Sequence, residues 1–319
     1  MRIPLLLFLT WSCAIAAEPA WIQELGGRLE RDAKGRVKAV DLRASWITDS
    51  DLALLAAWPD LERLDLSHTR ITDLGFQRLK PLRNLRELDL YYAEQIGDGA
   101  LTVAREWKQL RKINLRGTKV TDLGLAALAE HPSLEEIDCG FALLTDNGLA
   151  HLATLPKLRS LALGGQKLTD AGLNALRPAR QLRVLDLSGA QRTDSGLWSV
   201  TLTDAGLEAL ASLTALEQLN IRGAKITDVG CSKLAALTQL RLLDLSQTQI
   251  SARGLQGLVQ LPRLERLSLF GCPRIDDAAV AVLSQIKTLR WLDVEETRLT
   301  AAGLERLRSA LPSARIHHH

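Results

Sequence analysis

The chain has 319 residues, of which 46% are hydrophobic and 24% are charged, so its composition is that of a folded protein and excludes an intrinsically disordered one. Forty Lys and Arg residues against 37 Asp and Glu residues give a net charge of +3, which provides no broad positive field for the phosphates of a nucleic acid. Nucleic acid is therefore not an expected partner. Length alone would predict about two domains of roughly 150 residues each.

Residues 1–17 have the features of an export signal. Arg2 provides a positive start, residues 3–9 are apolar apart from Pro4, and residues 14–16 form a small-x-small cleavage site. No later apolar stretch approaches the ~20 residues that a membrane-spanning helix needs. We therefore expect an exported protein, periplasmic or secreted, with no membrane span. The alternative for this segment is a first buried helix.

Residues 18–36 predict an N-terminal cap. Trp21, Ile22 and Leu25 indicate a short helix with an apolar face, and two consecutive glycines end it at residues 26–27. Residues 28–32, together with a turn at residues 33–35, then indicate a hairpin that caps the strand beginning at Val37.

A repeat of 24 or 25 residues, in about eleven copies with one longer copy of 34 residues, fills residues 37–313. Each copy begins with L-x-x-L-x-L, which alternates inward and outward as a short strand does, and continues with T-D-x-G-L-x-x-L, which has the apolar spacing of a helix. Thr is expected to cap the helix, and Asp to lie at its positive end. One copy cannot bury its apolar face alone, but a stack of copies can. The copies start at Val37, Leu61, Leu85, Leu110, Leu134, Leu158, Leu182, Leu216, Leu240, Leu264 and Leu289.

This pattern resembles leucine-rich repeat proteins of the ribonuclease-inhibitor-like and cysteine-containing kinds. The segment Phe270-Gly271-Cys272-Pro273-Arg274-Ile275 resembles the G-C-x-x-I stretch of the cysteine-containing repeats. The resemblance implies an α/β fold, a leucine-rich repeat solenoid shaped as a right-handed horseshoe, with a parallel sheet on the concave side and helices on the convex side. It also implies a scaffold that binds a protein or peptide on its concave face.

Three cysteines come after the predicted export signal: Cys139, Cys231 and Cys272. Counted from the copy that starts at Leu61, they fall in the fourth, seventh and ninth copies of the repeat, too far apart for the Cα separation of about 7 Å that a disulfide allows. The sequence also contains no Asn-x-Ser/Thr glycosylation site. An exported protein without either feature is more typical of bacteria than of eukaryotes, so we expect a bacterial exported type.

The sequence contains no motif that predicts catalysis. It lacks G-x-S-x-G, H-E-x-x-H, C-x-x-C and a phosphate-binding glycine loop. His131 and His151 lie in predicted helix segments and do not face the strand surface, and His68, just after a strand, has no Cys or Ser neighbour on the predicted sheet edge. We therefore expect a protein that is not an enzyme and needs no cofactor, with a monomer as the favoured state.

Equivalent residues of neighbouring copies are expected to lie side by side on the sheet, about 4.8 Å apart. One outward column begins with Asp41, Asp65 and Asp89, the weak candidates for a metal site, since closely spaced carboxylates bind Ca²⁺. Arg43 and Arg63 stand close enough to neutralise these acids, so we expect no metal there. A cation-dependent module is kept as an alternative.

Exposed aromatic and arginine side chains are the residues enriched in protein interfaces. Tyr91, Phe270 and Trp291 point outward on their strands, and Trp198 lies in the longer copy. Tyr92 and Phe141 flank strand ends, where the alternative is local packing. The function predicted is a protein-binding scaffold; a secreted effector that acts on a host protein is a second alternative. The predicted partner-binding residues are Tyr91, Tyr92, Arg116, Phe141, Trp198, Phe270 and Trp291.

The longer copy carries a ten-residue insertion at residues 192–201, because without it Leu187 and Asp204 have the same spacing as Leu163 and Asp170. At the other end, residues 314–319 predict a strand stub and a tail that ends in histidines.

We predict that a chain lacking residues 192–201 folds and melts at or above the temperature of the parent, because insertions in surface loops contribute little to stability. Thermal unfolding followed by circular dichroism measures this. A large fall in melting temperature would place the insertion in the core and make the register wrong.

Overall fold

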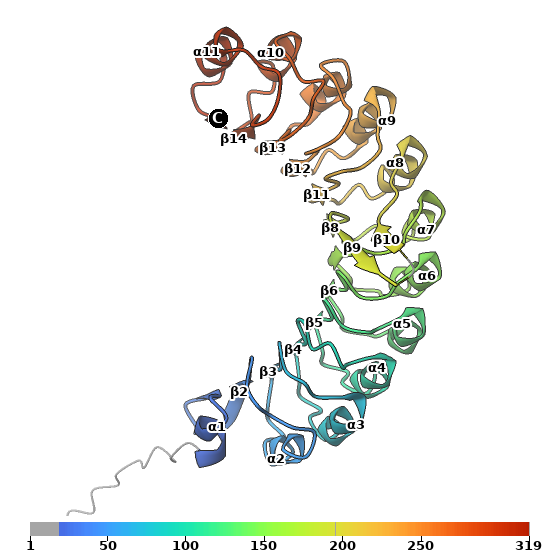
Figure 1. The fold of residues 1–319 in the computed structure, drawn as a ribbon, viewed down its shortest axis with the longest axis vertical. Coiled ribbons are helices and arrows are strands. Elements are labelled where there is room, and N and C mark those ends of the chain that lie inside the picture. Colours follow the sequence, from blue (N-terminus) through green and yellow to red (C-terminus); the bar gives the residue numbers. More distant parts are fainter. Residues whose placement is uncertain (1–18, 195, 319) are drawn as a thin grey trace, which may run out of the picture.

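The computed structural model describes residues 19–194 and 196–318. The predicted export signal at residues 1–17 lies outside the described residues. Figure 1 shows a curved solenoid in which the strands line the inner side of the arc and the helices line the outer side. This is the predicted leucine-rich repeat solenoid.

The inner side is one sheet of 13 strands. Strands β1 and β2 pair antiparallel, and every later pair is parallel. Its strands, in sheet order, are β1 (Arg28–Arg31), β2 (Val37–Asp41), β3 (Arg63–Asp65), β4 (Glu87–Asp89), β5 (Lys112–Asn114), β6 (Glu136–Asp138), β7 (Ser160–Ala162), β8 (Val184–Asp186), β11 (Gln218–Asn220), β12 (Leu242–Asp244), β13 (Arg266–Ser268), β14 (Trp291–Asp293) and β15 (Arg315–His317).

The outer side carries one short helical segment or more for each copy. The α-helices are α1 (Ala20–Glu24), α2 (Leu52–Leu55), α3 (Asp73–Phe76), α4 (Asp98–Ala104), α5 (Asp122–Leu128), α6 (Asp146–Ala153), α7 (Asp170–Asn174), α8 (Asp204–Leu210), α9 (Asp228–Ser232), α10 (Ala278–Leu283) and α11 (Ala301–Ala310). The 3₁₀ segments are η1 (Gln77–Leu79), η2 (Lys233–Ala236) and η3 (Gly254–Gln260).

The pairing register confirms that equivalent residues lie in columns. Asp41 pairs with Asp65, and Asp65 with Asp89, as the alignment of copies requires. Between sheet and helices the core consists of the repeat leucines, such as Leu61, which is 0% exposed. Since each layer of leucines contacts the next, the core runs unbroken through the solenoid.

A ladder of aspartates joins most copies to the next along the start of the helices. The Asp146 carboxylate accepts hydrogen bonds from the backbone N–H of Thr169 at 2.8 Å and from its hydroxyl at 2.6 Å. Thr169 in turn caps α7, since its hydroxyl accepts from the N–H of Ala171 at 3.2 Å. We call these bonds the Asp–Thr ladder. Its other rungs are Asp49–Thr72, Asp98–Thr121, Asp122–Thr145, Asp170–Thr203, Asp204–Thr227, Asp228–Ser251 and Asp277–Thr300.

The glycine of T-D-x-G is needed because the preceding carboxylate occupies its side-chain position. A Cβ on Gly172 would lie 2.1 Å from Oδ1 of Asp146. The copy at residues 276–279 has Ala279 in this position, and the copy before it has Ala252 in place of Asp. At Ala279, alanine is therefore found where the carboxylate is missing. Ala100 also occupies this position, in a copy where Gly97 replaces Thr, and there Asp73 accepts the N–H groups of Gly97 at 2.9 Å and Gly99 at 3.0 Å.

The first copy also departs from the pattern in a way that the Asp–Thr ladder explains. No earlier copy provides a carboxylate for Thr48, and Asp51 stands where the glycine would be. Oδ2 of Asp51 accepts from the backbone N–H of Thr48 at 2.9 Å and from its hydroxyl at 2.8 Å. The aspartate at the glycine position thus satisfies the donors of its own copy.

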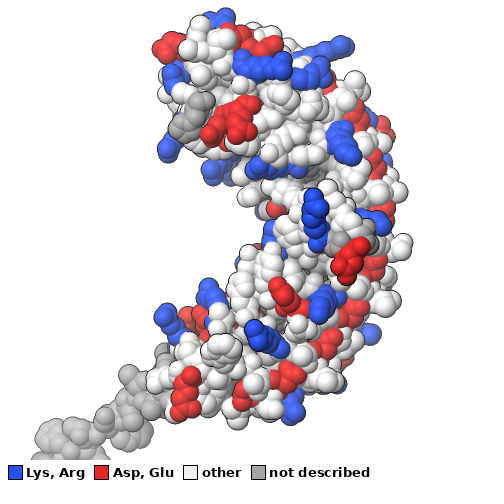
Figure 2. All heavy atoms as spheres, in the orientation of Figure 1, with Lys and Arg blue, Asp and Glu red and all other residues white. Residues whose placement is uncertain are grey.

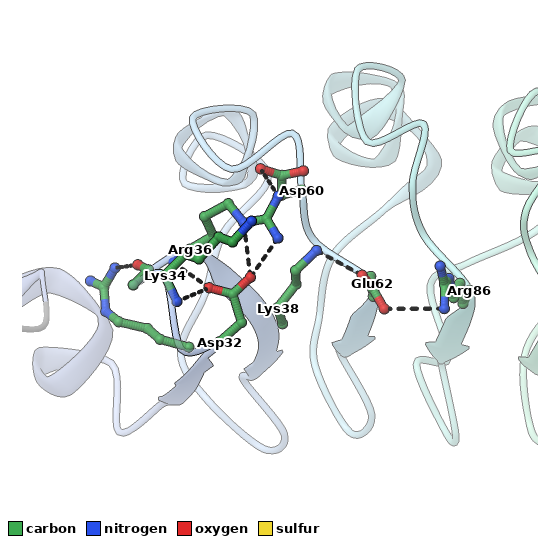
Figure 3. A network of polar contacts seen from close by, with 9 residues as sticks. Asp32, Lys34, Arg36, Lys38, Asp60, Glu62 and Arg86 are labelled. Carbon is green, nitrogen blue, oxygen red and sulfur yellow. Dashed lines mark hydrogen bonds and ion pairs between the residues drawn. The ribbon is translucent and has the colours of Figure 1, made fainter.

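The N-terminal segment covers the first repeat strand. Strand β1 adds to the sheet antiparallel to β2, and Trp21 of α1 stacks on Trp58 with ring centroids 5.6 Å apart. Figure 3 shows a chain of charges across the strand starts. In it Lys38 lies 2.7 Å from Glu62, whose other oxygen lies 3.4 Å from Arg86.

The insertion forms a hairpin rather than an irregular loop. Strands β9 (Ala190–Thr193) and β10 (Gly196–Ser199) pair antiparallel as a separate two-stranded sheet. Strand β8 pairs directly with β11, so the inner sheet continues past the hairpin without a break. The amide of Gln191 donates to the carbonyls of Ala142 at 2.9 Å and Gly165 at 2.8 Å, which anchors the hairpin to two earlier copies.

We predict that Gly172→Ala lowers the free energy of unfolding by about 2 kcal/mol, because the new methyl group displaces Asp146 from both of its bonds to Thr169. In an Asp146→Ala background the same change should be neutral or stabilising, because alanine favours a helix over glycine. Chemical denaturation of the four proteins gives the coupling. Additive effects would show that the Asp146 carboxylate is not the reason that residue 172 is glycine. The control is Ala279→Gly at the equivalent position, which should lower the free energy of unfolding by at most about 1 kcal/mol.

Candidate functional site

The inner face has a second regular column, at the ends of the strands, which explains most of its acids. Oδ1 of Asp89 accepts the backbone N–H of Tyr91 at 2.9 Å, two residues on. Asn114 makes the same turn with Arg116 at 3.1 Å. Such side-chain turns favour Asp and Asn where a chain leaves a strand. The other residues that make it are Asp41, Asp65, Asp138, Asp186, Asn220, Asp244 and Asp293.

The three acids considered for a metal lie beside an arginine. The guanidinium of Arg43 lies 2.7 Å from Asp41 and 3.5 Å from Asp65. Burial raises the pKa of the Asp41 carboxyl, but the hydrogen bonds from Arg43 outweigh it and the pKa is lowered overall. Across residues 19–194 and 196–318, no three His, Cys, Asp or Glu side chains are placed to hold a metal ion.

Tyr91 and Tyr92 form an aromatic cluster with His68 after β3 and β4. The two tyrosine rings meet edge to face with centroids 4.7 Å apart, and the Tyr92 ring stacks on His68 at 5.8 Å. His68 and Tyr92 have φ values of 56° and 51°. These values lie in the left-handed region, which costs a non-glycine residue about 1 kcal/mol or more.

Tyr92 and Phe141 pack on glycines of the next copies along the chain. A Cβ on Gly117 would lie 2.8 Å from Cδ1 of Tyr92, and a Cβ on Gly165 would lie 2.8 Å from Cδ1 of Phe141. Phe141 also lies 4.5 Å below the guanidinium of Arg116, which itself lies 3.6 Å from Asp138. Both rings are therefore half-buried in local packing, and Arg116 is held by two partners.

A first hollow of about 730 Å³, the N-terminal hollow, lies on the inner face from β1 to β7. Three of its four lining cations are already paired with acids: Lys112 lies 2.9 Å from Glu136, Arg63 pairs with Glu30 and Arg43 pairs with Asp41. Glu87 of β4 has no ion pair with any residue in the described part of the chain, so the hollow is acidic at its middle. The lining acids are Glu30, Asp41, Asp65, Glu87, Asp89, Glu136 and Asp138.

A second hollow of about 390 Å³, the C-terminal hollow, lies over β11 to β14. Phe270 and Trp291, two of the predicted partner-binding residues, line it. Arg222 lies 5.3 Å over the ring of Phe270, and Arg266 lies 5.3 Å over the ring of Trp291. The lining residues are Arg222, Leu242, Leu243, Asp244, Ser246, Arg266, Ser268, Phe270, Trp291 and Asp293.

The floor of the C-terminal hollow is a buried polar chain. The hydroxyls of Ser246 and Ser268 lie 2.8 Å apart, and Ser268 donates to Oδ2 of Asp293 at 3.4 Å. The three residues are 1%, 8% and 9% exposed, respectively. Apolar rings, arginines and hydroxyls thus meet in one concavity, which suits recognition of a group with both polar and apolar parts.

The predicted partner-binding residues therefore do not form one site. Phe270 and Trp291 meet in the C-terminal hollow. Tyr91, Tyr92, Arg116 and Phe141 lie instead after the ends of β4, β5 and β6, nearer the N-terminus. Trp198 is on β10 of the hairpin, opposite Gln191, and is half-buried. Sequence reasoning missed Arg222, Arg266, Ser246, Ser268 and Asp293.

One signal for the missed arginines was in the sequence. Arg222, Ser246 and Phe270 occupy the same position in three consecutive copies. The small Ser246 between them leaves space for the guanidinium to reach the ring two strands away. A small residue between an arginine and an aromatic residue in one column therefore indicates that the arginine contacts the aromatic ring.

The charged surface is mixed. In the view of Figure 2, Lys and Arg are interspersed with Asp and Glu, and neither sign covers a continuous field. None of the helices described between residues 19 and 318 is long and apolar enough to cross a membrane.

Comparison with known proteins agrees with this geometry. Residues 59–79, 109–129 and 212–235 match the family model described as Leucine Rich repeat. The solved structure of an internalin from Listeria monocytogenes is similar, with a TM-score of 0.62 and 21% sequence identity over 88% of this chain and 82% of that chain. No curated protein matches the chain. Three segments of the chain thus match the leucine-rich repeat model, and the likeness to the internalin shows the fold alone.

We predict that Asp89→Asn stabilises the protein by about 0.5 kcal/mol at pH 7, the scale of one cross-strand pair. Burial and the charge of Asp65 raise the pKa of the Asp89 carboxyl, so its ionised form is disfavoured in the folded state. Asparagine keeps the turn, as Asn114 does.

Since the folded-state pKa is raised, the stability linked to this carboxyl is present at low pH and lost as the pH rises through that pKa. The gain from Asp89→Asn should therefore vanish once the pH falls below the ordinary value of 3.8. Melting temperatures of both proteins between pH 3 and 8 measure this, and a gain independent of pH would contradict the assignment.

Proposed function

We propose that this protein is a non-catalytic scaffold that binds a protein or peptide on the inner face of its solenoid. The observation that carries the proposal is the C-terminal hollow, where Phe270 and Trp291 stand on the concave sheet with an arginine over each ring. Aromatic and arginine side chains dominate the binding energy of protein interfaces. The strand-end acids support this interpretation, because their hydrogen bonds to the turns explain why they are present without assigning them a catalytic role.

We also propose that residues 1–17 direct export to the periplasm or outside the cell, and that the mature chain acts as a monomer of bacterial type. The cysteine-containing subtype has support from Cys272, which is buried and donates to the carbonyl of Leu245 in the preceding copy at 3.2 Å. Cys231 is buried as well, and burial raises the pKa of its thiol to about 12, which keeps it unreactive.

Two alternatives make different demands. A secreted effector would use the same inner face on a host protein, so only the source of the partner distinguishes it. A cation-dependent module would need Asp41 and Asp65 as ligands, where Arg43 now lies. Millimolar Ca²⁺ that raised the melting temperature, with the effect lost in Asp65→Asn, would favour this module.

We predict that mature chain immobilised on beads captures a specific protein from an envelope extract of the source cells. The double variant Phe270→Ala/Trp291→Ala should lose at least 10-fold in affinity, since it removes two interface anchors of about 1 kcal/mol or more each. The matched control is Leu74→Ala/Leu123→Ala, because these side chains are 81% and 77% exposed at helix starts, away from the inner face. Equal loss in both variants, or capture of a glycan alone, would contradict the proposal.

A further inference from the structure

The arginines of the C-terminal hollow differ from most cations of the N-terminal hollow. Arg222 contacts the Phe270 ring and donates from Nε to Oε1 of Gln247 at 3.2 Å, and Arg266 contacts the Trp291 ring. Neither has an ion pair with any acid among residues 19–194 and 196–318. The cations of the N-terminal hollow that do have one are Arg43, Arg63 and Lys112.

The acids beneath these arginines are already engaged with the chain. Asp293 accepts the backbone N–H of Glu295 at 3.0 Å as well as the Ser268 hydroxyl, and Asp244 accepts the N–H of Ser246 at 2.8 Å. The walls therefore present unpaired guanidinium donors, while the floor presents acceptors and hydroxyls. The lining has two positive and two negative side chains, which fits a ligand with one negative charge and neighbouring N–H donors better than a dianion.

We propose that the C-terminal hollow binds the side-chain carboxylate of an Asp or Glu in an extended segment of the protein partner. Guanidinium groups pair with carboxylates through two parallel hydrogen bonds. Both arginines already lie against aromatic rings, so little side-chain freedom is lost when they bind. Backbone N–H groups of the segment reach the acceptors of the floor, and an apolar residue next to the acid contacts Phe270 and Trp291. This inference rests on the proposed function.

The test is selection of random 12-residue peptides displayed on phage against the full chain. We expect the enriched sequences to carry Asp or Glu beside an apolar residue. Labelled synthetic copies, measured by fluorescence anisotropy, should bind about 10-fold or more weakly when the acid is replaced by its amide, the equivalent of 1.4 kcal/mol for a charged hydrogen-bonded pair. Arg222→Gln and Arg266→Gln should cause the same loss.

Arg63→Gln is the matched control, because Arg63 and Arg266 occupy the same strand position on β3 and β13 and both are exposed. The Arg63→Gln variant should bind the peptides within about 2-fold of the parent affinity. Residue 63 is separated from the C-terminal hollow by much more than the Debye length, which is about 10 Å at 0.1 M salt. Unchanged far-ultraviolet circular dichroism and melting temperature establish that each variant is folded.

Three outcomes overturn this inference while the proposed function stands: enriched peptides that are neutral or basic, peptides that bind more tightly with phosphoserine than with glutamate, and peptides whose binding depends on Glu87 and Asp89 of the N-terminal hollow. Peptides insensitive to every substitution on the inner face, or no enrichment at all, count against both the inference and the proposed function.

Discussion

The carboxylate in most T-D-x-G segments binds the threonine or serine of the next copy, and this contact determines much of the rest of the solenoid. It satisfies a backbone N–H that would otherwise have no partner, and it holds the hydroxyl that caps the next helix. It also excludes any side chain at the glycine of that helix. Since the inner strands are tied by their own hydrogen bonds, each copy is held to its neighbour along two edges.

The consequence for function is that most charged residues of the repeat are already engaged. The acids that come after the threonines hold the helices, and the acids and amides at the strand ends turn the chain, as Asp89 and Asn114 do. If every aspartate on the inner face were treated as a potential metal ligand or catalytic group, the strand-end acids would be misinterpreted as a metal site or a catalytic pair. The informative groups are instead charged side chains such as Arg266, which contacts the Trp291 ring but has no ion pair among residues 19–194 and 196–318.

Much of the fold could be predicted from the sequence because its signals are local and repeated. The period, the columns on the sheet and the position of the insertion all result from aligning the copies. The role of the aspartates could not be predicted, because a carboxylate at a helix start and one that binds the next copy have the same sequence pattern. Of the candidate site, the sequence identifies Phe270 and Trp291 as outward-facing aromatics, and both are half-buried in the structure. The arginines over their rings could not be predicted, because those contacts depend on side chains that cross between copies.

The longer copy lies between the two hollows, and its hairpin leaves the inner sheet continuous from β8 to β11. Seven strand spacings separate β4, in the acidic middle of the N-terminal hollow, from β13 in the C-terminal hollow, which is about 34 Å along the sheet. An extended peptide of about ten residues spans that distance at roughly 3.3 Å per residue. A single small molecule does not. If one partner contacts both hollows, it must therefore be a folded surface or an extended segment of at least that length, with its acidic residue over the C-terminal hollow and its basic residues over β4.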